Sequence, residues 1–187
     1  MVRRLDIKDF FPSTQSKRIY WFFHEQMKCS PDVANALMKI LTFKNCLPTG
    51  SPSSPILSYF SYVTMWKAIS DIVWNANCII TVYMDDVTIS GKNVPDKIVW
   101  QIKKQFYYYG LCDNKHKEKQ YSKKSAYEVT GIIVKDGKLK LPNRQHQKIY
   151  KTRKQICQET DLVKRKKLYQ RLEGLNSQAQ QIIKANL

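Results

Sequence analysis

Tyr83-Met84-Asp85-Asp86 lies between two short apolar segments, residues 78–82 and 87–91. Both segments are rich in β-branched residues, which is typical of buried strands, so these four residues are expected at the tip of a hairpin. Two adjacent carboxylates repel each other, and partial burial adds a desolvation cost. A bound Mg²⁺ would remove both costs, because it takes carboxylate ligands beside water and phosphate oxygens. An exposed Asp-Asp turn is the alternative, and the pair alone does not exclude it.

A third carboxylate, Asp6, ends the first expected strand, residues 2–7. If this strand pairs beside the hairpin, Asp6, Asp85 and Asp86 converge at one edge of a sheet. Three carboxylates can hold two cations about 4 Å apart, and such a pair stabilises the attacking and leaving oxygens of a phosphoryl displacement. The pattern therefore predicts polymerase chemistry.

The charge of the chain indicates a polyanionic partner. Its 187 residues carry 32 Lys and Arg against 15 Asp and Glu, a formal charge of +17, while 43% hydrophobic residues indicate a globular protein. Such a charge destabilises a compact state by self-repulsion, and nucleic acid would relieve it. A basic protein with a solvated lysine surface is the alternative. Nucleic acid is favoured because the basic residues cluster in the C-terminal half.

The cysteines and the N-terminus indicate a cytoplasmic protein with no membrane partner. No two cysteines form a CxxC pair and their number is odd, so reduced thiols are expected; they are Cys29, Cys46, Cys78, Cys112 and Cys157. The first residues, Met-Val-Arg-Arg-Leu-Asp, are not followed by the apolar run of a signal peptide. No apolar stretch approaches the length of a membrane span.

The remaining pattern predicts alternating helices and strands. Helices are expected over residues 15–28, from Ser30-Pro31 onward, over about 55–74 and over 95–109, and a strand over 128–134 with a turn at 135–138 and a return strand at 139–141. Residues 113–124 are strongly basic. From Pro142 the chain is expected to be helical to its end, with breaks near Asp161 and Gly174.

Four segments resemble the motifs of reverse transcriptases, in the order of that family. Residues 5–13 resemble motif A, residues 47–55 motif B, Tyr83-Met84-Asp85-Asp86 motif C and residues 110–117 motif D. Val129-Thr130-Gly131 and the basic tail most resemble bacterial retron-type reverse transcriptases, with a related defence reverse transcriptase as the alternative. Thr49 departs from the glutamine usual in motif B, which affects the expected dNTP contacts and fidelity.

The resemblance implies an α+β fold, the palm of a right-hand polymerase. It is an antiparallel sheet with helices packed on one face, followed by a small helical thumb. Residues 1–141 would form the palm with motifs A to E, and residues 142–187 the basic thumb. The family's N-terminal fingers region, with its triphosphate-gripping basic residues, would be absent, and Arg3 and Arg4 are a poor substitute for it.

The resemblance also implies the residues of the catalytic site. The catalytic set would be Asp6, Asp85, Asp86 and Lys117, and two Mg²⁺ ions, or Mn²⁺ in their place, would be held by Asp6, Asp85, Asp86 and the carbonyl of Ile7. Lys117 would protonate the leaving pyrophosphate, or would be one more phosphate-contacting lysine. Phe11 would clash with a ribonucleotide 2′-hydroxyl, while Thr49, Gly50, Tyr83 and Met84 would complete the nucleotide site.

The implied function is that of a retron-type RNA-directed DNA polymerase, copying a structured RNA into DNA from dNTPs in anti-phage defence. The RNA contacts would come from Asn114, Thr130, Lys148, Lys151, Arg153 and Lys154. An effector protein or a separate fingers-containing chain would be a further partner. The alternative is a non-catalytic or partial RNA-binding subunit that needs a separate fingers polypeptide.

Overall fold

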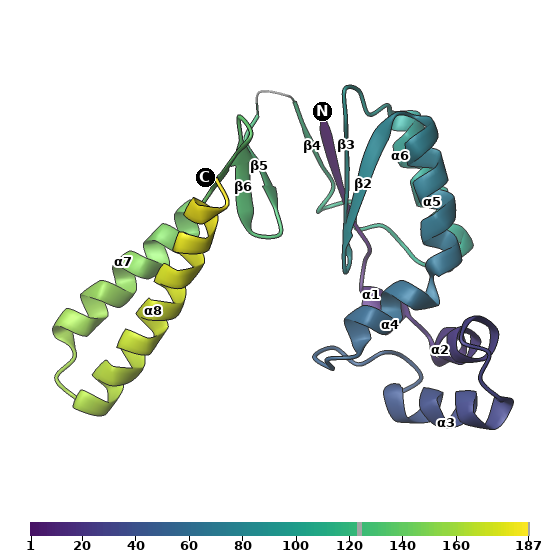
Figure 1. The fold of residues 1–187 in the computed structure, drawn as a ribbon, viewed down its shortest axis with the longest axis horizontal. Coiled ribbons are helices and arrows are strands. Elements are labelled where there is room, and N and C mark those ends of the chain that lie inside the picture. The colour runs from purple at the N-terminus through teal and green to yellow at the C-terminus, as the bar shows by residue number, and fades with distance from the viewer. Residues whose placement is uncertain (123–124, 187) are drawn as a thin grey trace. The chain divides into compact units, whose positions relative to one another are not determined.

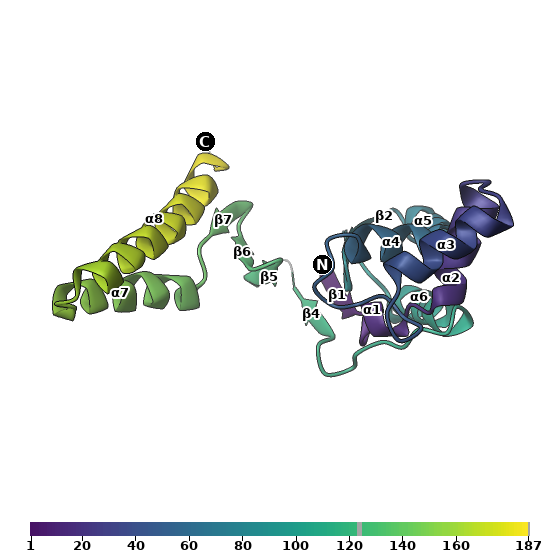
Figure 2. The ribbon, with the colours of Figure 1, turned by 90° about the horizontal axis from the view of Figure 1, so that it is seen from below.

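The computed structural model describes residues 1–122 and 125–186 and divides the chain into two compact units, residues 1–122 and 123–187. Lys123 and Lys124 of the expected basic segment, and Leu187 of the expected thumb, lie outside the described residues. Figures 1 and 2 show the elements of each unit. The small sheet of residues 127–140 groups with the C-terminal helices, whereas the sequence pattern placed it with the first domain.

The N-terminal unit is built on a four-stranded antiparallel sheet in the order β2-β3-β1-β4. Its strands are β1 (Val2–Asp6), β2 (Cys78–Tyr83), β3 (Asp86–Gly91) and β4 (Lys119–Tyr121). The expected pairing of the first strand beside the hairpin is confirmed, in a register that places Asp6 opposite Asp86. The sequence pattern missed β4, because its three residues are polar and it forms only as an edge strand beside β1.

Two helices, α5 (Val63–Asn75) and α6 (Asp96–Tyr108), cover one face of this sheet (Figure 1). Side chains alternate along a strand, so Leu5 of β1 and Val87 and Ile89 of β3 point into the core between sheet and helices. Ile102 and Phe106 of α6 meet them there and are fully buried. The opposite face of the sheet therefore carries Arg4, Asp6 and Asp86.

Several short helices precede α5. They are α1 (Phe10–Ser13), α2 (Ser16–Trp21) with the π-helical turn η1 (Phe22–Gln26), α3 (Pro31–Leu41) and α4 (Ser54–Ser61). The helix start expected at Ser30-Pro31 is confirmed by α3. The single helix expected over residues 55–74 is wrong, because Tyr62 leaves helical geometry between α4 and α5. Its ring is buried against Phe10 and Tyr109, a contact that the helical periodicity of the sequence does not reveal.

The C-terminal unit contains the sheet β5 (Tyr127–Val129), β6 (Ile132–Lys135) and β7 (Lys138–Lys140), then α7 (Asn143–Gln158) and α8 (Leu162–Lys184). The single strand expected over residues 128–134 is wrong. Thr130 and Gly131 have φ of 48° and 84° and form a two-residue hairpin turn, for which positive φ suits the strand twist. The turn expected at residues 135–138 is confirmed by the pairing of Lys135 with Lys138.

One of the two expected breaks in the C-terminal helical region is confirmed. Asp161 is the N-cap of α8, and its carboxylate accepts hydrogen bonds from the N–H groups of Val163 and Lys164 at 2.8 and 3.3 Å. The break expected near Gly174 is wrong, because α8 continues through it. An interior glycine costs a helix only about 1 kcal/mol, which the packing of α8 along α7 offsets.

The expectation of reduced cysteines agrees with the structure, in which all five thiols are free. Among residues 1–122 and 125–186, none of the helices has both the length and the apolar character needed to cross a membrane.

Candidate active site

The end of β1 is joined by main-chain hydrogen bonds to two segments far away in the sequence. The N–H of Ile7 donates to the carbonyl of Asp85 at 2.9 Å, and the N–H of Asn114 donates to the carbonyl of Asp6 at 2.8 Å. A further bond from the N–H of Lys117 to the carbonyl of Asn114, at 3.0 Å, fixes the following turn. These bonds bring the segments that resemble motifs A, C and D to one edge of the sheet.

The turn between β2 and β3 holds Met84 in a left-handed conformation, with φ of 53°. A non-glycine residue in this region costs of order 1 kcal/mol or more, and such strain is concentrated at functional sites. The turn leaves Tyr83 and Met84 partly exposed and carries Asp85 to the end of β1. The local backbone therefore serves to position Asp85 beside Asp6.

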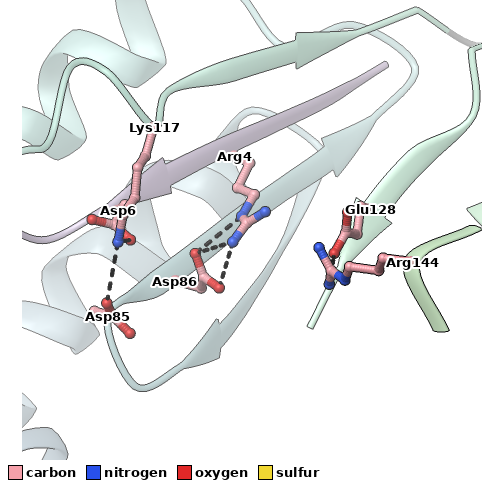
Figure 3. Close-up of polar contacts among 7 residues, drawn as sticks. All are labelled: Arg4, Asp6, Asp85, Asp86, Lys117, Glu128 and Arg144. Carbon is pink, nitrogen blue, oxygen red and sulfur yellow. Dashed lines mark hydrogen bonds and ion pairs between the residues drawn. The ribbon is translucent and has the colours of Figure 1, made fainter. Parts of the chain in front are cut away.

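Asp6 and Asp85 lie on either side of the ammonium group of Lys117 (Figure 3). The Lys117 Nζ is 2.8 Å from Asp6 Oδ2 and 4.0 Å from Asp85 Oδ2. Asp6 is only 3% exposed, and its second oxygen, Oδ1, has no hydrogen-bond partner in the described part of the chain. A buried carboxylate oxygen without a partner is costly, so this site strongly favours a cation.

The pKa values of this group reflect burial and crowded charge. Burial raises the pKa of the Asp85 carboxyl, the negative charges of Asp6 and Asp86 raise it further, and Lys117 opposes the rise. The hydrogen bond to Asp6 raises the pKa of the Lys117 ammonium above its usual value. Lys117 is therefore held as a cation, and the fold disfavours the charged form of Asp85.

Asp86 is held by Arg4 and not by Lys117. Asp6 and Asp86 are directly opposed on β1 and β3, where like charges destabilise a sheet. Arg4 lies two residues before Asp6 on the same face and donates three hydrogen bonds of 2.7 to 3.0 Å to the Asp86 carboxylate (Figure 3). Burial by itself would lower the pKa of Arg4, but these hydrogen bonds outweigh it and the pKa is raised. Both side chains are about one-fifth exposed.

The sequence pattern missed the role of Arg4. The available signal was the two-residue spacing of Arg4 and Asp6 along β1, because residues two apart in a strand share a face. The pattern considered Arg3 and Arg4 only as triphosphate contacts. In the structure Arg3 forms an ion pair with Asp96 and Arg4 with Asp86, so both guanidinium groups are already engaged.

A pocket of about 280 Å³ opens beside the two carboxylates. It is lined by Asp6, Asp9, Phe10, Phe11, Pro12, Thr49, Asp85, Asn114 and Lys117. Six of these residues were proposed from the sequence, although Asn114 was assigned to RNA and not to this pocket. Asp9 was missed, and it lines the pocket from a left-handed conformation with φ of 47°. The proposed residues Gly50, Tyr83, Met84 and Asp86 are not among its lining residues.

The donor set fits a divalent cation bound through two carboxylates. Within residues 1–122 and 125–186, no cluster of three or more His, Cys, Asp or Glu side chains is arranged to hold a metal, and the third carboxylate, Asp86, is bound by Arg4. Mg²⁺ commonly takes only one or two carboxylates and completes its shell with water and substrate phosphates. Asp6, with its unpartnered Oδ1, and Asp85 meet that requirement. The Ile7 residue is fully buried beside them, and a role for its carbonyl stays a prediction.

The residues proposed for RNA contact, apart from Asn114, lie in the C-terminal unit. Thr130 is exposed at the tip of the β5–β6 hairpin, and the four basic residues are exposed along α7; they are Lys148, Lys151, Arg153 and Lys154. Arg144, at the start of α7, forms an ion pair with Glu128 of β5 (Figure 3). This pair connects the helix to the small sheet, and it does not involve the four basic residues proposed for RNA contact.

Comparison with known proteins identifies the family. Residues 1–134 match the sequence model of the family described as "Reverse transcriptase (RNA-dependent DNA polymerase)". The chain belongs to the reverse transcriptase family. The expected resemblance to its retron branch is confirmed by two curated relatives, named as retron reverse transcriptases.

The two relatives are similar to this reverse transcriptase-family chain over most of its length. "Retron Ec86 reverse transcriptase" of Escherichia coli is 28% identical over 153 residues, which cover 79% of this chain and 47% of that protein. "Retron Se72 reverse transcriptase" of Salmonella heidelberg (strain 579083-10) is 26% identical over 182 residues, which cover 91% of this chain and 48% of that protein. The chain thus spans about half the length of the curated relatives it matches.

Removing the Arg4 guanidinium should destabilise the N-terminal unit. Arg4→Met leaves the Asp86 carboxylate opposite Asp6 without a partner, so we expect a loss of about 1–3 kcal/mol in the free energy of unfolding. Adding Asp86→Asn should recover part of the loss, which urea denaturation at pH 7 would measure as a double-mutant coupling. As a matched control, Arg144→Met removes the more exposed ion pair with Glu128 and should cost less than about 1 kcal/mol. Equal losses in both variants would contradict this role of Arg4.

Neutralising Asp85 should stabilise the folded protein at pH values above the pKa of this carboxyl. Because folding raises that pKa, the charged form is less favourable in the folded chain than in the unfolded chain. Asp85→Asn should therefore raise the melting temperature at pH 7–8, by at most about 3 °C since the side chain is 44% exposed. The difference should shrink as the pH falls through the folded-state pKa. Asp71→Asn, at an exposed position of α5, is the control, and a pH-independent difference for Asp85 would refute the argument.

Proposed function

We propose that this chain carries the catalytic site of an RNA-directed DNA polymerase of the retron type. The observation that carries the proposal is the pairing of Asp6 and Asp85 around the Lys117 cation, at the edge of a pocket that Phe11 and Thr49 also line. These residues come from the segments that resemble motifs A to D of the family to which the chain belongs. Metal-assisted nucleotidyl transfer is the chemistry that such a constellation suits.

In this proposal Asp6 and Asp85 hold Mg²⁺, or Mn²⁺ in its place, with Ile7 and Asp86 as the further members of a two-ion site. When bound, the ions would supply charge stabilisation for the phosphoryl oxygens. Asp86 acts through the Arg4 pair, which fixes its carboxylate next to Asp6 without adding a free negative charge. Because Arg4 compensates Asp86, the remaining negative charge of the three carboxylates lies on Asp6 and Asp85.

Lys117 has two roles that its position allows. Its raised pKa keeps it protonated at neutral pH, so it can contact a phosphate as a cation. If an incoming triphosphate draws the ammonium away from Asp6, Lys117 is placed to donate a proton to the leaving pyrophosphate as negative charge develops there. Either role requires the lysine to exchange one anionic partner for another.

The rest of the proposed nucleotide site comes from the segments that resemble motifs A, B and C. Phe11 would lie against the sugar and exclude a 2′-hydroxyl, while Thr49 and Gly50 would face the nascent base pair. Tyr83 and Met84, partly exposed on the hairpin turn, would approach the primer end. The sheet with its two covering helices would then be the palm, and the helices from residue 142 the thumb.

The substrates and the biological setting follow from the similarity to the retron reverse transcriptases. A structured RNA would be template and primer, dNTPs the substrates, and DNA the product. RNA would be contacted through Asn114, Thr130 and the exposed basic residues of α7, since phosphate contacts by Lys and Arg dominate the affinity of such complexes. Anti-phage defence in the cytoplasm, with an effector or a separate fingers chain as partner, is the setting that this type of enzyme suggests.

A second candidate is an RNA-binding subunit without chemistry of its own. The observation that favours it is the engagement of the cations nearest to the carboxylates. Arg3, Arg4 and Lys117 all form ion pairs with carboxylates of the chain, so none is free to grip a triphosphate unless a pair opens. The basic surface of α7 would serve this function equally well.

Primer extension separates the two candidates. With an RNA template, a DNA primer, dNTPs and Mg²⁺, we expect the wild-type chain to extend the primer and Asp85→Asn to be about 1,000-fold slower, since several kcal/mol of transition-state stabilisation would be lost. Asp71→Asn should match the wild type. Equal rates for wild type and Asp85→Asn would refute the polymerase. Intact RNA binding with no extension by the wild-type chain would favour the binding subunit.

The sugar preference offers a test of Phe11. Phe11→Ala removes the ring that we expect to clash with a 2′-hydroxyl, so the preference for dNTPs over NTPs in the same reaction should fall by about 10- to 100-fold. Single-nucleotide incorporation with each substrate measures the ratio of kcat/KM values. Phe43→Ala, at an exposed ring of the same unit, should leave this ratio unchanged. An unchanged ratio in Phe11→Ala would show that another residue selects the sugar.

A further inference from the structure

The outer face of α6 carries aromatic rings alternating with cations. The exposed aromatic and basic residues are Lys97, Trp100, Lys104, Tyr107 and Tyr108, which recur at three- and four-residue spacing and so share one face of the helix; Asp96, in its first turn, is exposed as well. Trp100 is 56% exposed and Tyr108 is 82% exposed. The opposite face supplies Ile98, Ile102 and Phe106 to the core, so the exposed rings are not needed for folding.

One cation on this face, Lys104, is in contact with a ring. Lys104 Nζ lies 3.5 Å from the centre of the Trp100 ring, the geometry of a cation–π contact. The only acidic residue within α6, Asp96, is already paired with Arg3. Tyr107 is also engaged, since its hydroxyl donates to Asp113. Lys97, Trp100, Lys104 and Tyr108 remain exposed on this face, with Lys104 lying over the Trp100 ring.

A pocket at the C-terminal end of α6 continues this face. It measures about 450 Å³ and is lined by Lys17, Arg18, Trp21, Tyr108, Tyr109 and Gly110. Arg18 is held in place by three rings, with its guanidinium 4.7 Å from the centre of Tyr109, 5.1 Å from Tyr62 and 5.5 Å from Trp21. None of the pocket's lining residues lines the pocket of the carboxylates. Tyr108 belongs both to the pocket and to the outer face of α6.

We propose that the outer face of α6 and the pocket at its end form a second binding surface for single-stranded nucleic acid, separate from the carboxylate pocket. Unpaired bases stack on aromatic side chains and the phosphates are neutralised by adjacent Lys and Arg, which is how non-specific single-strand sites are built. Trp100 and Tyr108 supply the rings, while Lys17, Arg18 and Lys104 supply the cations. The formal charge of +17 favours the same polyanionic partner.

A protein partner is less well matched to this surface. The buried centre of a protein interface is depleted of lysine. Here Lys97 and Lys104 stand on the same face as the rings, and Lys17 lines the adjoining pocket. Single-stranded RNA and single-stranded DNA share the chemistry that the surface recognises, so the test includes both.

The test uses the full chain without Mg²⁺ or dNTPs, so that failure of this proposal leaves the polymerase proposal untouched. Fluorescence anisotropy measures the Kd of twelve-nucleotide oligo(U) and oligo(dT) for the wild type and for Trp100→Ala/Tyr108→Ala. Stacking is worth about 1–3 kcal/mol per base, so we expect binding to weaken at least about fivefold for one or both oligonucleotides. Trp74→Ala is the matched control, because Trp74 is 78% exposed on the neighbouring helix α5.

Two further measurements distinguish binding at this surface from binding elsewhere on the chain. Photocrosslinking with 5-iodouracil oligonucleotides should label Trp100 or Tyr108, as identified by mass spectrometry of the peptides. Lys104→Gln should reduce the slope of log K against log salt by about 0.7, whereas Lys67→Gln on α5 should not. Circular dichroism melting confirms that the variants fold. Unchanged Kd values, with crosslinks only in the C-terminal unit, would overturn the proposal.

Discussion

Electrostatic repulsion among three carboxylates at one edge of a sheet is the constraint on which the candidate site depends. The strand register places Asp6 directly opposite Asp86, and the hairpin turn adds Asp85 beside them. Two cations compensate in different ways. Arg4 binds Asp86 with three hydrogen bonds, whereas Lys117 lies between Asp6 and Asp85. The first pair is built into the sheet, and the second is open to exchange with a ligand.

The sheet order explains why these groups meet. Because β1 lies between β3 and β4, its end reaches both the hairpin turn and the segment that carries Lys117. Strand alternation then separates the two faces. Leu5 and its neighbours face the core under α5 and α6, while Arg4 and Asp6 face the opposite side. Rigid packing on one face thereby holds the charged groups of the other face in place.

The helices that cover the sheet also carry a surface of their own. The inner side of α6 completes the core, and its outer side presents Trp100, Lys104 and Tyr108 beside the pocket formed with α2. One helix therefore supports the sheet that carries the carboxylate site and also presents the surface that we propose for single-stranded nucleic acid. In the C-terminal unit, the ion pair of Arg144 with Glu128 holds α7 to its small sheet while the exposed lysines of α7 remain available.

Local pattern was enough to predict several parts of this protein. The β-branched flanks of Asp85 and Asp86, the end of the first strand at Asp6 and the ordered motifs were sufficient for the α+β class, the hairpin and the placement of the first strand beside it. Three features became visible only in the folded chain: Arg4 binds Asp86, Asp9 lines the pocket, and Tyr62 divides one expected helix into two. Those features depend on which distant side chains meet across strands and between helices. The periodicity of the sequence indicates which face of a strand or helix a residue occupies. It does not indicate which residue of another element will contact that face.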